Sequence, residues 1–75
     1  MTLVDLKRNQ KATIIELPRD EALAAQLLEQ GFVPKSEISL AHVAPWNGPM
    51  AFRLDNTKIT LGQQVAKQIK IDFIQ

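Results

Sequence analysis

The chain has 75 residues, a formal net charge of +1 and no cysteine, and 45% of its residues are hydrophobic against 23% charged. This composition is that of one globular domain, residues 1–75, whose core is too small to enclose a large active site. The lack of cysteine excludes disulfides, cysteine-bound zinc and a thiol nucleophile, and the even spread of charge gives no sign of nonspecific attraction to nucleic acid.

The N-terminal residues carry charge early and lack a continuous apolar stretch. That pattern argues against a signal peptide or a membrane-spanning helix, so we expect a cytoplasmic protein. Thr2 and Asp5 have the spacing of a capping box, which predicts a short helical turn. Asn9, which tolerates the left-handed conformation, then leads into a strand over residues 11–17.

A helix is predicted over residues 21–30. Asp20 is a suitable N-cap for this helix, because its short carboxylate can accept a hydrogen bond from a free amide of the first turn. Leu23, Leu27 and Leu28 recur at helical spacing. We therefore expect these three side chains on one face, which covers one end of the fold.

The helix is expected to end at Gly31, which adopts the left-handed conformation more easily than other residues. Phe32, just beyond the glycine, would pack back on Leu27, the hydrophobic contact that accompanies this type of helix end. Pro34 then prevents further helix.

A second strand follows, because from Ser36 the apolar period changes to two, with Ile38 and Leu40 on one face. His42, the only histidine, shares their parity and would face inward on an unbroken strand. The proline- and glycine-containing run at residues 44–49 is predicted to be a loop.

Large apolar side chains alternate on both sides of the dipeptide Asp55-Asn56, at Met50, Phe52 and Leu54 before it and at Ile59 and Leu61 after it, which predicts a β-hairpin over residues 50–61. Thr60 and Gln63 have capping-box spacing, so we expect a second short helix to start there.

The last strand is predicted over residues 70–74. Several short strands interrupted by two short helices indicate a mainly β fold, and we expect the strands to close into a small β-barrel, because closure buries their apolar faces and removes exposed edges. The side chains expected in its core are Leu3, Leu6, Phe32, Met50, Phe52, Leu54, Ile59, Leu61, Val65, Ala66, Ile69 and Phe73.

Four stretches of the chain stand out in this order of elements: LVDLKRNQKATIIEL, LLEQGFVPKSEISL, APWNGPMAFRL and KITLGQQVAKQI. Together they resemble the ferrous iron transport protein A family, the small cytoplasmic component of the bacterial Feo ferrous iron uptake system. The family pattern has glycines where this chain has Asn9, Lys35 and Asn56, and charged residues where it has residues 62–64. Asparagine can replace glycine at a left-handed position, but lysine does so less easily, so we expect altered backbone geometry at Lys35.

The resemblance implies an SH3-like small β-barrel. It also implies a small cytoplasmic accessory protein that binds ferrous iron transport protein B, a membrane transporter with a cytoplasmic GTPase domain, and regulates or assembles it. The sequence itself offers no nucleophile beside a base, no phosphate-binding glycine loop and no paired carboxylates, so we expect neither enzymatic activity nor a bound cofactor.

Three residues are predicted to contact a partner: Trp46 in the proline-flanked loop, and Arg53 and Lys58, which flank the hairpin turn. The alternative for Trp46 is a lid packed over the barrel end, and the alternative for the two basic residues is a solvating role. Because the chain has one histidine and no cysteine, we expect no metal site built from protein ligands alone.

Two other functions remain open. A small barrel with a slight positive charge also fits a nucleic-acid-binding module, which would bind RNA or DNA with a steep salt dependence. A related barrel forms the last domain of some metal-dependent repressors, so a freestanding metal-sensing barrel is the second alternative.

Overall fold

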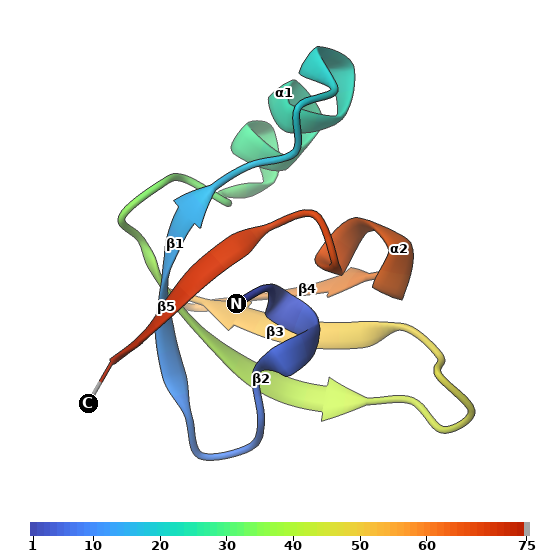
Figure 1. The fold of residues 1–75 in the computed structure, drawn as a ribbon. Helices are drawn as coiled ribbons and strands as arrows, with labels where there is room; N and C mark the ends of the chain where they lie inside the picture. The colour runs from blue at the N-terminus through green and yellow to red at the C-terminus, as the bar shows by residue number, and fades with distance from the viewer. Residues whose placement is uncertain (75) are drawn as a thin grey trace.

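The computed structural model describes residues 1–74, which form the predicted series of short strands and helices (Figure 1). In chain order the elements are the 3₁₀ helix η1 (Leu3–Asp5), β1 (Lys11–Glu16), α1 (Glu21–Gln30), β2 (Glu37–Val43), β3 (Met50–Leu54), β4 (Thr57–Leu61), α2 (Gln63–Ala66) and β5 (Lys70–Ile74). The fold is mainly β with short helices, as the sequence predicts.

The strands form one antiparallel sheet in the order β4-β3-β2-β1-β5. Two irregularities interrupt its ladders, at Ile15 in β1 and at Ala41 in β2. An extra residue of this kind bends its strand and increases the local twist. The five strands therefore curl around a common core instead of forming a flat layer (Figure 1).

The ends of this curled sheet are not hydrogen-bonded to each other, which corrects the expectation that closure removes every strand edge. β4 and β5 lie at opposite ends of the strand order, and α2 connects them. The start of β5 is covered by the N-terminus: the amide of Ile71 donates to the carbonyl of Met1 (2.9 Å), and that of Leu3 donates to the carbonyl of Ile69 (3.1 Å). β4, by contrast, pairs only with β3 within residues 1–74.

The core contains most of the apolar side chains that the sequence placed there. Phe32 and Phe52 are its largest members, and both are fully buried. Ile59, Val65 and Phe73 are only partly buried and pack against the core from its rim. The buried apolar side chains of this cluster are Leu3, Leu6, Ala12, Ile14, Leu27, Phe32, Ile38, Met50, Phe52, Leu54, Leu61, Ala66, Ile69 and Ile71.

Helix α1 begins and ends where the sequence predicts. At its start the amide of Leu23 donates to Oδ1 of Asp20 (3.1 Å). At its end Gly31 has a φ of 106°, and the amide of Phe32 donates to the carbonyl of Leu27 (2.9 Å). This is the left-handed helix end for which glycine is preferred.

The prediction that Leu28 shares the buried face of α1 is wrong, since its side chain is 46% exposed. Only Leu27 is fully buried, and Leu23 packs against the core from the rim. The reason is the placement of the helix, which stands above the sheet rather than lying across it (Figure 1). None of the helices within residues 1–74 has the length and apolar character needed to cross a membrane.

Two local predictions in the second half are also corrected. Thr60 does not cap α2, because it is part of β4 and pairs with Ala51; the residue before α2 is Gly62, which makes no side-chain cap. In the β3–β4 turn the left-handed residue is Asp55, with a φ of 52°, and not Asn56. Strand pairing places Thr60 in β4, and the register of the β3–β4 turn makes Asp55 its left-handed residue. Both depend on the whole sheet and not on local spacing.

Lys35 has a left-handed backbone, with a φ of 76°, so the lysine adopts the conformation that favours glycine and the expected change in backbone geometry is not seen. It lies in the turn in which the amide of Ser36 donates to the carbonyl of Val33 (3.0 Å), and its own amide donates to the carbonyl of Ile14 (2.7 Å). A side chain in the left-handed region costs about 1–2 kcal/mol. Pairing with β1 holds the lysine in this conformation.

We expect Lys35→Gly to stabilise the protein by about 1 kcal/mol, because glycine adopts this φ without the steric cost of a Cβ atom. Thermal unfolding followed by circular dichroism should show a midpoint higher by about 4–8 °C for a domain of this size. Lys67→Gly is the matched control, since Lys67 has a φ of −62° and gains nothing from glycine. A midpoint for Lys35→Gly at or below that of the wild type would contradict the strain argument.

Candidate functional site

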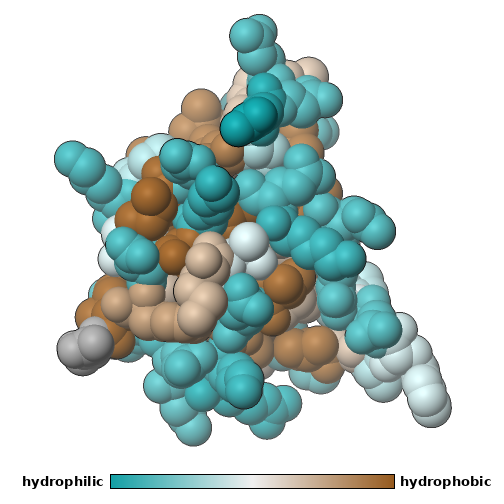
Figure 2. Space-filling view, in the orientation of Figure 1, coloured by the Kyte–Doolittle hydropathy of each residue, from teal (hydrophilic) through white to brown (hydrophobic). Residues whose placement is uncertain are grey.

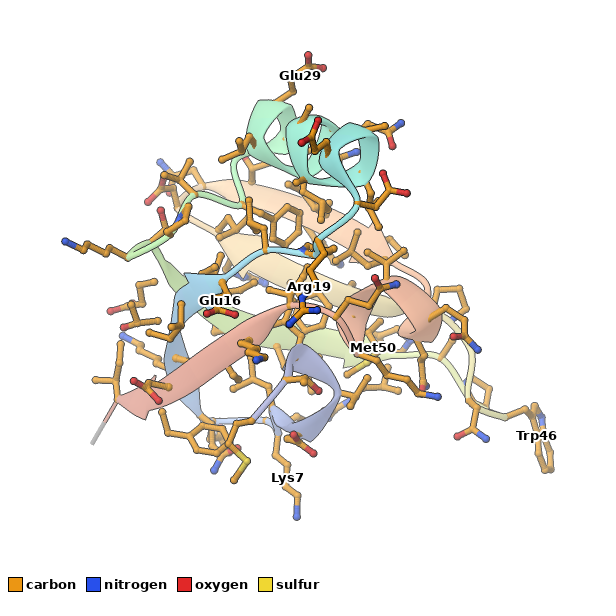
Figure 3. The ribbon with its side chains drawn as sticks, turned by 45° about the horizontal axis from the view of Figure 1, so that its top comes forward. Lys7, Glu16, Arg19, Glu29, Trp46 and Met50 are labelled. Carbon is orange, nitrogen blue, oxygen red and sulfur yellow. The ribbon has the colours of Figure 1, made fainter. Side chains whose placement is uncertain are left out.

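Trp46 lies at the tip of the β2–β3 loop and is 95% exposed. Its side chain points away from the body of the molecule (Figure 3). The alternative in which the indole forms a lid over the barrel end does not fit this exposure. In the space-filling view the same loop forms a pale projection at the lower right (Figure 2).

The tip of this loop is a tight turn that does not suit tryptophan. The amide of Gly48 donates to the carbonyl of Pro45 (3.1 Å), and the two residues between them, Trp46 and Asn47, have φ values of 62° and 56°. Turns with two left-handed central residues favour glycine, asparagine and aspartate. Asn47 fits this preference, whereas a bulky side chain at positive φ is an outlier. Such local strain is concentrated at functional sites.

The base of the loop is held in place by its neighbours. The amide of Ala44 donates to the carbonyl of Pro49 (3.0 Å), and Nε2 of Gln63 in α2 donates to the carbonyl of Gly48 (3.2 Å). A Cβ atom on Gly48 would lie 2.8 Å from Cβ of Ala44, so only glycine fits there without a shift. The structure therefore presents Trp46 on a fixed support.

Arg53 and Lys58 are brought together, away from Trp46. They are direct cross-strand partners in the β3–β4 ladder, and both are exposed. β3 starts at Met50 beside the Trp46 loop and ends at Leu54 beside the hairpin turn. The three predicted contact residues thus lie on two separate parts of the surface, at opposite ends of β3, which spacing in the sequence did not reveal.

Lys11 is a further basic residue on this second part of the surface that sequence reasoning missed. Lys11 in β1 pairs with Ser39 in β2, and Ser39 pairs with Arg53 in β3. With the Arg53–Lys58 pair, these registers make one continuous row across four strands. We call Lys11, Ser39, Arg53 and Lys58 the basic row. Alternation marks Lys11 as outward-facing, but only strand order and register place it beside Arg53.

The surface around the basic row has two sides of different charge. On the side of the hairpin turn lie Glu37 and Asp55, and Oε2 of Glu37 is 3.7 Å from Nζ of Lys11. On the other side a shallow depression is lined by uncharged residues together with Lys11 and Arg53. Its lining residues are Asn9, Gln10, Lys11, Ser39, Leu40, Ala41 and Arg53.

His42 does not face the core. The irregularity at Ala41 shifts the alternation of β2, so that Leu40 pairs with Phe52 but His42 pairs with Ala51, and the histidine is exposed. The prediction that His42 faces inward assumed an unbroken strand, and β2 is interrupted at Ala41. Within residues 1–74 no three histidine or carboxylate side chains are grouped closely enough to hold a metal ion.

Comparison with known proteins gives one consistent result. The model of the FeoA domain family matches residues 1–72. A Campylobacter jejuni protein named as an Fe(2+) transport protein A is 32% identical over 74 residues, which are 99% of this chain and 100% of that protein.

Solved structures agree with this match. The solution structure of iron(II) transport protein A from Clostridium thermocellum has a TM-score of 0.92 at 32% identity; the similarity covers 99% of this chain and 46% of that one. The crystal structure of Stenotrophomonas maltophilia FeoA complexed with zinc has a TM-score of 0.82 at 26% identity, over 96% of this chain and 89% of the other. That protein is described as an SH3 domain protein, which confirms the predicted SH3-like fold.

Proposed function

This chain belongs to the FeoA family, and on that premise we propose that it acts as one domain, residues 1–75, in a small cytoplasmic accessory role in ferrous iron transport. Its partner is the cytoplasmic part of the membrane transporter, ferrous iron transport protein B, which carries the GTPase domain. The match of residues 1–72 to the family carries the proposal. The role is to bind and to regulate or assemble the transporter, without catalysis and without a cofactor.

The exposed loop supports a binding role. Tryptophan is enriched among the residues that dominate the energy of protein interfaces. Trp46 is 95% exposed, and hydrogen bonds at Ala44 and Gly48 fix the loop that carries it. A loop whose backbone is already ordered loses little conformational entropy when the partner binds. We therefore assign Trp46 as the main contact to the transporter.

The proposal is tested by deleting the gene and measuring ferrous iron uptake by the cells under anoxic or reducing conditions. Uptake is expected to fall several-fold, because the transporter loses the protein that activates or assembles it. Expression of the wild-type chain from a plasmid should restore uptake. The amount of transporter in the membrane must be measured in parallel, so that a lower rate is not confused with a lower amount of transporter.

Physical association is the second part of the same test. The purified chain should be retained by the immobilised cytoplasmic part of the transporter from the same organism. Comparing GTP hydrolysis and oligomer size with and without the chain separates stimulation of hydrolysis from assembly. Normal uptake in the deletion strain, together with no association, would rule out the proposed function.

A further inference from the structure

The basic row contains a pair of like charges, Arg53 and Lys58, and neither residue takes part in the ion pairs found within residues 1–74. Arg53 and Lys58 are directly opposite each other, and side chains in such a pair have Cβ atoms about 4.5–5.5 Å apart. Like charges at this distance destabilise a sheet. The ion pairs found within residues 1–74 join Lys11 to Glu37 and Lys70 to Glu16, so neither involves Arg53 or Lys58.

The depression beside the row offers hydrogen-bond donors to an anion. Lys11 and Arg53 lie at two of its borders, two strand spacings or about 10 Å apart, with the half-buried Ser39 between them. Gln10 uses its Oε1 to accept the amide of Lys7 (2.9 Å), which leaves its NH2 group as a donor. Charged donors to a carboxylate make stronger hydrogen bonds than neutral ones.

From this arrangement we infer that the basic row and the adjoining depression bind an acidic segment of a protein partner, with a carboxylate seated over Ser39 between Lys11 and Arg53. Lys58 extends the positive surface to about 14 Å across four strands. Same-side carboxylates of an extended peptide are about 7 Å apart, so two of them fall within this length. The bound carboxylates also offset the repulsion between Arg53 and Lys58.

A nucleic acid fits this surface less well than an acidic peptide. Proteins that bind single strands combine a charged groove with aromatic side chains on which bases stack. The row contains no aromatic residue, Phe52 is buried behind it, and Trp46 lies at the opposite end of β3.

Titration of the isotope-labelled protein with a hexaglutamate peptide, followed by NMR, tests the inference. At an ionic strength of about 0.01 M, where screening is weak, amide shift changes should be concentrated at Lys11, Ser39, Arg53 and Lys58. Hexaglutamine should cause none. Arg53→Gln should weaken hexaglutamate binding about tenfold or more, because it removes a charged hydrogen bond to the carboxylate.

Lys67→Gln is the matched control, since it removes the same charge from an exposed residue that follows α2 and is outside the row. It should bind hexaglutamate as the wild type does. Arg53→Gln should also unfold at the same temperature as the wild type or a higher one, because it removes the repulsion by Lys58, so weaker binding would not reflect misfolding. Equal binding by Arg53→Gln and wild type, or equal loss in both variants, would overturn the inference.

An oligothymidylate of similar length is the remaining probe, and tighter binding of it than of hexaglutamate would also overturn the inference by assigning the row to nucleic acid. The inference rests on the proposed function in one respect, which is that the partner of this chain is a protein. Because the titration does not involve the transporter, normal iron uptake in a deletion strain would remove the proposed function and leave the peptide result unaffected.

Discussion

Replacing Phe52 with alanine is expected to destabilise the protein by about 3–5 kcal/mol, which is the usual cost of deleting a buried phenyl ring. Phe52 is fully buried in β3, where it pairs with Leu40 on one side and Ile59 on the other. A domain of this size rarely has more than about 3–5 kcal/mol of stability from its core. The variant should therefore be largely unfolded at physiological temperature, as measured by circular dichroism and urea titration.

Two other substitutions show whether the loss comes from the buried position. Phe52→Leu keeps most of the apolar volume and should cost less than about 1.5–2 kcal/mol. Phe73→Ala removes the same ring from a half-buried position on β5 and should cost clearly less than Phe52→Ala, about 1–2 kcal/mol. A Phe52→Ala variant as stable as Phe73→Ala would mean that the core is not centred on β3.

Replacing Trp46 with alanine is expected to weaken association with the transporter by at least about 30-fold, the effect of losing an interface residue worth about 2 kcal/mol. The fold should be preserved, because the indole is 95% exposed and stabilises nothing within the chain. Two values are compared between the variant and the wild type. They are the dissociation constant for the purified cytoplasmic part of the transporter and the thermal unfolding midpoint of the free protein.

Leu28→Ala is the control for Trp46→Ala, because it removes an exposed apolar side chain from α1, which belongs to a different part of the surface. Its binding should match the wild type. Trp46→Gly should lose binding as Trp46→Ala does. It should nevertheless unfold at a higher temperature than Trp46→Ala, since glycine relieves the left-handed strain at φ 62°. A large loss of thermal stability in Trp46→Ala would instead assign the indole a structural role.

The sole tryptophan gives an independent check of this exposure. The free protein should show the fluorescence emission of a water-exposed indole before it unfolds, with little further shift on unfolding. Addition of the transporter's cytoplasmic part should shift the emission of Trp46 toward that of a buried indole. An unchanged spectrum in a complex that forms by other means would place the contact elsewhere.

Local rules of the chain were sufficient for features that depend on neighbouring residues. Asp20 and Gly31 define the two ends of α1, because a cap and a left-handed helix end each need only a few residues. The alternation in residues 50–54 placed Met50, Phe52 and Leu54 in the core.

Local sequence rules did not predict the features that depend on distant parts of the chain. Leu28 has helical spacing suited to burial, but α1 stands away from the sheet and leaves it exposed. His42 has inward parity, but the irregularity at Ala41 reverses it. Thr60 has the spacing of a cap, but strand pairing with Ala51 takes precedence.

The sequence by itself determined a small, mainly β domain and most of its core, and it named Trp46, Arg53 and Lys58 as candidate contact residues. Only the tertiary structure decided that Trp46 is exposed, that it lies apart from Arg53 and Lys58, and that Lys11 joins these two residues in one row. The physical reason is that periodicity fixes which face of a strand a side chain occupies, whereas strand order and register fix its neighbours. Strand order and register follow from how the whole core packs, so no short stretch of sequence determines them.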